Sequence, residues 1–163
     1  MKKSLFYYVL AMLCMVSLFT SCSNDEDAAV SAANEVVGEY SGKLNVFIVS
    51  SDGKNVPSGT IDSQAITVTK AGDNAINLSI TNFTFNNIPL GNIELKDCAL
   101  TANGDKYDFT GTTNLNNQIL TADVAATGSF SNGTLTLDLD IDAVLGGVMN
   151  QTVKVTYSGT KQK

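Results

Sequence analysis

The stretch GSFSNGTLTLDLDI, residues 128–141, carries the clearest structural signal in the chain. Asn132 and Gly133 form a dipeptide typical of a tight β-turn, because both residues tolerate the positive φ that such turns require. After the turn, leucine and isoleucine alternate with threonine and aspartate, which is the period of a strand with one buried and one exposed face. The stretch therefore predicts a β-hairpin with an apolar inner face.

Segments of the same kind fill the chain from Gly38 to Lys161, and each ends in turn-forming residues. No stretch has the spacing and caps of an amphipathic helix, apart from a candidate short turn at 143–149. Short connections favour antiparallel neighbours, and eight strands with one apolar face each must stack as two sheets or close into a barrel. The expected strands are 39–50, 63–70, 75–85, 88–101, 106–113, 118–130, 134–143 and 151–160.

A repeated tripeptide favours closure. Tyr-Ser-Gly occurs at residues 40–42 on the first expected strand and at residues 157–159 on the last. If these strands are neighbours, Gly42 and Gly159 allow sharp curvature where side chains would clash. Coincidence is the alternative, because the chain is rich in Ser, Thr and Gly. We predict an all-β fold, an eight-stranded antiparallel up-and-down barrel.

Five stretches carry a family resemblance, in the order VVGEYSGKLNV, ITVTKAGDNAINLSITNFTF, IPLGNIELKDCALTANGDKYDFTGTT, GSFSNGTLTLDLDI and VKVTYSGTK. Their strand spacing and Gly-containing turns resemble the calycin-like β-barrel domain found in many Bacteroidota lipoproteins, over nearly all of residues 36–161. The resemblance implies a barrel comparable in outline with lipocalins and avidin, and it supplies neither a ligand nor catalytic residues. The chain has no Trp and so lacks the Gly-x-Trp of true lipocalins.

Residues 1–21 have the form of a lipoprotein signal peptide. Lys2 and Lys3 precede an apolar run over residues 5–19, which is shorter than the roughly 20 residues that span a bilayer. The sequence FTSC that ends at Cys22 resembles the lipobox, in which the cysteine receives a diacylglyceryl group and becomes the new N-terminus. The alternative is a secreted protein with an ordinary thiol. We expect Cys22 to be lipidated and to anchor the chain to a membrane.

Residues 22–35 are small, polar and acidic, and we expect them to form a flexible tether before a barrel domain at residues 36–163. The acidic run at residues 25–27 resembles the export signal of surface-displayed Bacteroidota lipoproteins. The predicted location is therefore the outer membrane, with the barrel exposed at the cell surface.

The composition disfavours several function classes. After removal of residues 1–21, the remaining 142 residues carry 8 basic and 16 acidic side chains, with no Arg and no His. This balance argues against nucleic acid, whose phosphates need positive partners. Cys98 is left as a lone thiol without a histidine base, and we expect it to be a buried core residue. We predict no enzymatic activity and no cofactor.

Two groups of carboxylates are candidate sites with simpler explanations. Asp138, Asp140 and Asp142 alternate along one strand and offer hard oxygen ligands for Ca²⁺, but an EF-hand type loop needs Gly at position 143 and Glu at position 149, where Ala and Met stand. A solvated outer face explains them better, and no metal is expected. Glu94 and Asp97 invite comparison with paired-carboxylate hydrolases, but strand parity places them on opposite faces unless a bulge intervenes.

The barrel interior is the expected functional surface. Eight-stranded barrels are either filled by their own side chains or hold one small ligand, and the sequence leaves both open. The side chains predicted to line the interior are Leu44, Val46, Ile48, Ile66, Val68, Ile76, Leu78, Ile80, Leu95, Leu135, Leu137, Leu139, Ile141, Val153 and Val155.

The apolar connection AVLGGVM at residues 143–149 either plugs one barrel end or forms an apolar lip, with Val144, Leu145 and Met149 at the mouth. The first functional hypothesis is a lipid-anchored envelope protein that binds a small apolar ligand in the barrel. The alternative is a non-enzymatic interaction module with a filled barrel, which presents loops 51–59 and 86–91 to an envelope protein or a glycan.

Overall fold

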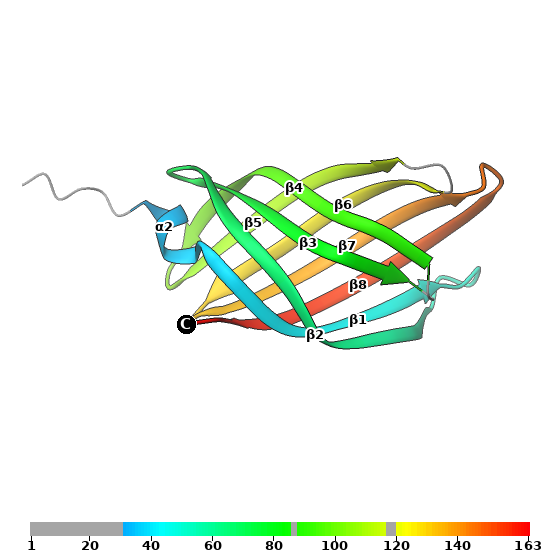
Figure 1. The fold of residues 1–163 in the computed structure, drawn as a ribbon, viewed down its shortest axis with the longest axis horizontal. Coiled ribbons are helices and arrows are strands. Elements are labelled where there is room, and N and C mark those ends of the chain that lie inside the picture. The colour runs from blue at the N-terminus through cyan, green and yellow to red at the C-terminus, as the bar shows by residue number, and fades with distance from the viewer. Residues whose placement is uncertain (1–30, 86–87, 117–119) are drawn as a thin grey trace, which may run out of the picture.

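The computed structural model describes residues 31–85, 88–116 and 120–163 (Figure 1). Every strand pairs antiparallel with the next one, and the last pairs with the first, so that the sheet closes into a barrel. This confirms the predicted eight-stranded up-and-down barrel. Its elements are α2 (Ala32–Val36), β1 (Gly38–Val49), β2 (Asn55–Gly72), β3 (Ala75–Phe85), β4 (Ile88–Asn103), β5 (Lys106–Asn116), β6 (Leu120–Ser131), β7 (Thr134–Leu145) and β8 (Met149–Lys161).

The barrel closes where the repeated tripeptide predicted. In the β1–β8 ladder Gly42 lies directly opposite Gly159. A Cβ atom placed on Gly42 would overlap the backbone of Ser158 and of Gly159, so the two strands approach too closely for any side chain at this point. Glycine is required here for backbone contact rather than for a turn.

The barrel has two ends, and they differ. The helix end carries α2, the C-terminus and the β2–β3, β4–β5 and β6–β7 turns, at the left of Figure 1. The distal end carries the β1–β2 and β7–β8 turns, at the right of Figure 1. The first described residues, Ser31 and α2, therefore lie at the helix end.

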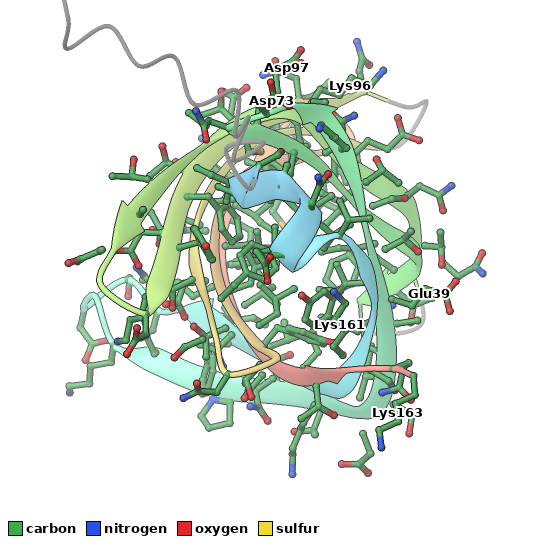
Figure 2. All side chains as sticks on the ribbon, turned by 90° about the vertical axis from the view of Figure 1, so that its left-hand side faces the viewer. Glu39, Asp73, Lys96, Asp97, Lys161 and Lys163 are labelled. Carbon is green, nitrogen blue, oxygen red and sulfur yellow. The ribbon has the colours of Figure 1, made fainter. Side chains whose placement is uncertain are left out.

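Helix α2 is absent from the sequence-based prediction. Ala33 and Val36 are buried against the barrel, and Ser31 Oγ donates a hydrogen bond to the Asp73 carbonyl at 2.8 Å. Figure 2 shows α2 lying across the barrel opening. The predicted tether of residues 22–35 is thus wrong at its C-terminal side, because residues 31–35 fold onto the barrel. Five residues are too few for a periodic signal, and packing rather than propensity stabilises so short a helix.

The second strand is also longer than predicted. It begins at Asn55 instead of residue 63, and Pro57 lies opposite Phe47 in the β1–β2 ladder. Two register shifts in this ladder accommodate the irregular sequence, which has no clear alternation. The expected loop 51–59 is therefore a short turn, and residues 55–59 belong to β2. Of the other expected loop, 86–91, residues 86 and 87 lie outside the described residues and residues 88–91 belong to β4.

The middle of the barrel, which we call the waist, is filled with apolar side chains. A side chain without accessible surface borders no space that a water molecule could enter. Since many described side chains in the waist have almost no accessible surface, the waist is close-packed there. Phe109 packs so tightly on Gly128 that a Cβ atom there would lie 2.5 Å from its ring. The largest side chains with less than 2% of their surface exposed are Tyr40, Phe83, Leu44, Ile66, Ile76, Leu78, Ile80, Ile93, Leu95, Leu135, Leu137 and Leu139.

Candidate functional site

The structure brings the fifteen predicted interior residues together on the inner face of the barrel. Fourteen of them are buried, and Ile48 is partly exposed because it lies near the distal end. Sequence reasoning missed further buried residues from β3 to β6, and alternation along β6 was a signal that could have found four of them, Leu120, Ala122, Val124 and Ala126. The missed core side chains are Phe83, Ile93, Leu100, Phe109, Leu120, Ala122, Val124, Ala126 and Phe130.

The packed waist limits where a ligand can sit. Leu44, Ile66 and Leu95 have no measurable exposed surface, so no ligand-sized space borders them. Drug-sized ligands in proteins occupy pockets of about 300–1,000 Å³. The described waist residues therefore leave no room for a ligand among themselves, and any binding surface would have to lie at an end of the barrel.

The distal end presents an apolar rim, which we call the distal mouth and define as Ile48, Val56, Leu145 and Met149. Ile48 lies opposite Val56, and Leu145 lies opposite Met149, so both pairs continue the inner face of the barrel. Val56 is 48% exposed and Met149 is 61% exposed. Among the described residues, the large hydrophobic side chains that are exposed are these two and Val148, in the adjacent turn.

The β7–β8 connection does not fold into the barrel. Its turn residues Gly146, Gly147 and Val148 are all exposed, and Val148 is 89% exposed. Of the two alternatives for residues 143–149, a plug and an apolar lip, the plug is therefore wrong, because β7 and β8 continue as a paired hairpin up to the turn. Of the three residues predicted for the mouth, Leu145 and Met149 pair at the distal end with inward parity, whereas strand alternation places Val144 on the outer face.

The barrel wall is incompletely paired toward the distal end. Among the described residues, the β4–β5 ladder joins only Ala99–Asn103 to Lys106–Thr110, although both strands are longer. The β2–β3 ladder likewise starts at Ile66, and beyond it the Gln64 side-chain amide donates to the Thr81 carbonyl at 3.2 Å. In the described part of the chain, the distal half of the β3–β4 hairpin thus has no ladder to β2 or to β5, and the Gln64–Thr81 hydrogen bond links it to β2.

Two tyrosines and one glutamine form a buried polar cluster that the sequence did not reveal. The Tyr40 hydroxyl donates to the Val36 carbonyl at 2.8 Å, and the Tyr157 hydroxyl donates to the Gln64 carbonyl at 3.3 Å. Burial raises the pKa of each phenol to about 12, and the Tyr40 phenol adds to the shift at Tyr157. Both hydroxyls therefore stay neutral and join α2 and β8 to the barrel wall.

The aspartate row on β7 lies on the outer face. Lys154 Nζ lies 2.7 Å from Asp140, and the Thr152 hydroxyl donates to Asp142 at 2.8 Å. The hydrogen bond from Lys154 to Asp140 raises the pKa of that lysine. No group of three His, Cys, Asp or Glu side chains within the described residues is arranged to hold a metal ion.

Glu94 and Asp97 are both exposed, because the bulge that strand parity left open as an exception does intervene between them. Asp97 has a φ of 52°, and the β3–β4 register shifts in this region. The bulge turns Asp97 outward and Cys98 inward. Cys98 is buried, and burial together with the charge of Asp97 raises the pKa of its thiol. These features make Cys98 a core residue.

The fold and the apolar mouth define a class: a closed up-and-down β-barrel of the kind that supports ligand binding. A model of the calycin-like beta-barrel domain matches residues 36–160. The chain therefore belongs to this family, as the resemblance of its strands implied. It has no significant match among curated proteins or among solved structures. Within the described residues, no helix is long and apolar enough to cross a membrane.

Proposed function

We propose that this chain is a lipid-anchored envelope protein that binds a small apolar molecule at the distal mouth of its barrel. Cys22 carries the anchor, the protein is displayed on the outer membrane at the cell surface, and no catalysis is involved. The waist serves as a rigid floor beneath the bound molecule.

The observation that carries this proposal is the distribution of exposed apolar surface. The exposed side chains Val56, Val148 and Met149 all lie at the distal end, whereas the chain enters the barrel at the helix end. An anchor at Cys22 would keep the helix end toward the membrane and leave the distal mouth facing away from it. Apolar groups exposed together on a soluble surface favour binding of an apolar partner.

The packed waist favours a second candidate. A filled barrel needs no ligand, and it can act as a non-enzymatic interaction module that presents its outer surface to an envelope protein or a glycan. In that case the exposed apolar turn at residues 146–148 would contact the partner instead of a small molecule.

Native mass spectrometry of the processed chain, purified from its own host, tests the first candidate. We expect an apolar compound that is lost on denaturation, and the intact mass should show the acyl chains on Cys22. Met149→Asp should abolish the bound mass, because it places a charge in the apolar mouth. Asn150→Asp is the matched control, since it adds the same charge to the neighbouring exposed residue on the outer face.

The two candidates differ in the outcome. Loss of the ligand in Met149→Asp but not in Asn150→Asp supports binding at the mouth. A bare protein that takes up no fluorescent fatty acid refutes it and leaves the interaction module. An unmodified Cys22 thiol, or protection of the barrel from protease added to whole cells, would contradict the anchor and the surface display.

A further inference from the structure

A hollow of about 220 Å³ opens at the helix end, opposite the proposed mouth. Its walls are the end of α2, the β4–β5 turn and the β6–β7 turn, and its floor is aromatic. Tyr40 and Phe130 lie at the bottom of the hollow with ring centroids 5.5 Å apart and are almost fully buried, whereas Tyr107 beside them is only half-buried and exposes more of its surface. The volume is below the usual range for drug-sized ligands, so it suits a small molecule or one head group.

The charged side chains that line this hollow are both acidic. Glu35 comes from α2 and Asp105 from the β4–β5 turn, and neither carboxylate takes part in an ion pair among the described residues. They are exposed and so remain free to receive a positively charged group from solution.

The nearby cations do not occupy this position. Lys161 lies inside the barrel opening beside α2 (Figure 2), but its ammonium donates to the Glu35 carbonyl at 3.0 Å and does not line the hollow. Lys106 precedes Tyr107 on β5, and strand alternation turns it to the outer face. Glu39 lies outside the wall at the same end (Figure 2).

We propose that this hollow binds an organic ammonium group. An ammonium is attracted by the two carboxylates and by the π-electrons of an aromatic ring that it can reach, which in this hollow is the half-buried Tyr107. The methylene groups that carry the ammonium would rest on Tyr107, the half-buried ring of the lining. Both carboxylates are solvated, so the affinity should be low and should fall with rising salt.

Two sources supply this chemistry: a soluble amine, and the ethanolamine head group of a membrane lipid. Cys22 and Ser31 are nine residues apart, which an extended chain spans in at most about 30 Å. The helix end would therefore stay close to the membrane surface. The lipid source depends on the lipidation proposed above, whereas binding of a free amine does not.

Tyrosine fluorescence can report on the hollow directly. The processed chain has no Trp and three tyrosines, and two of these, Tyr40 and Tyr107, line the hollow. The processed full-length protein in phosphatidylglycerol nanodiscs is titrated with ethanolamine, with choline and with 3,3-dimethylbutan-1-ol, the uncharged isostere of choline. We expect saturable binding of both cations and none of the neutral alcohol.

Substitution of the carboxylates tests the residues. Glu35→Gln and Asp105→Asn should each weaken binding about two- to fivefold, as expected for one solvated charge pair. Glu39→Gln removes the same charge from the same end outside the hollow, and it should leave binding unchanged. Circular dichroism of each variant shows whether the barrel is intact.

The outcomes separate the sources and can overturn the proposal. Weaker binding of free ethanolamine in nanodiscs that contain phosphatidylethanolamine indicates that the lipid head group competes for the site. Equal binding in both nanodiscs indicates a soluble amine. Three results would refute the proposal. The first is that 3,3-dimethylbutan-1-ol binds as strongly as choline, and the second is that Glu39→Gln weakens amine binding as much as Glu35→Gln does. The third is that no amine gives a saturable signal. Met149→Asp should not affect these titrations. A failure to find an apolar ligand at the distal mouth can therefore be distinguished from a failure to bind amines in the hollow.

Discussion

Barrel closure depends on two glycines that face each other across the β1–β8 ladder, and the substitution Gly42→Ala tests this directly. The added Cβ atom would overlap the carbonyl of Ser158 and the Cα atom of Gly159. Both are backbone atoms, so no change of rotamer relieves the overlap. The two strands must move apart at the point where the barrel closes.

The expected loss of stability follows from two opposing effects. Overpacking of this kind costs about 1–3 kcal/mol. Replacement of glycine by alanine also restricts the unfolded chain, which by itself stabilises the folded state by about 0.4–1 kcal/mol. For Gly42→Ala we expect the overlap to dominate, with a net loss of about 0.5–2.5 kcal/mol after the gain is subtracted from the cost. This corresponds to a decrease in Tm of about 2–10 °C for a domain of this size.

Gly59→Ala is the matched control. Gly59 lies on β2 opposite Val46, and a Cβ atom placed on it would meet nothing within 4 Å. This variant should unfold at the same denaturant concentration as the parent, or at a slightly higher one. Urea unfolding followed by circular dichroism measures both variants. Equal midpoints for Gly42→Ala and Gly59→Ala would refute the argument that close backbone contact at Gly42 is needed for closure.

Two further predictions concern buried titratable groups. The pKa of Tyr40 and of Tyr157 is raised from the usual value of 10 to about 12 in the folded protein. The stability that these neutral phenols confer is therefore complete below pH 10, and it is lost as the pH rises through about 12. Urea unfolding between pH 8 and 12 should therefore show a decline that is smaller in Tyr40→Phe, and an unchanged decline would contradict this assignment. The raised pKa of the Cys98 thiol predicts that iodoacetamide alkylates it slowly at neutral pH until the barrel unfolds. Rapid reaction of the folded protein would show that Cys98 is accessible, and a second reactive thiol after unfolding would show that Cys22 carries no lipid.

The local features of the fold could be predicted because they repeat over short distances. Asn132 and Gly133 determine a turn by their own conformational preferences, and Leu135, Leu137 and Leu139 mark an inner face by their period of two. The same reasoning located the core side of β7 and β8 and the closing glycine pair.

The prediction failed where the period is interrupted. The register shift before Phe83 and the bulge at Asp97 change which residues face inward, and a bulge leaves no reliable mark in a sequence rich in Asn, Thr and Asp. The start of β2 was missed for the same reason, because its first residues pair with β1 without regular alternation.

The sequence by itself determined the class of fold, the order of the strands and the apolar inner face, because each of these depends on neighbouring residues or on one repeated pattern. The repeated Tyr-Ser-Gly favoured a closing contact between Gly42 and Gly159, with coincidence as the alternative, and the structure decided between the two. Only the tertiary structure decided that the waist is packed, that apolar side chains are exposed at the distal end, and that Glu35, Asp105 and Tyr107 surround one hollow. These properties depend on the volumes and positions of side chains from strands far apart in the sequence, and no local pattern records how such side chains fill a common space.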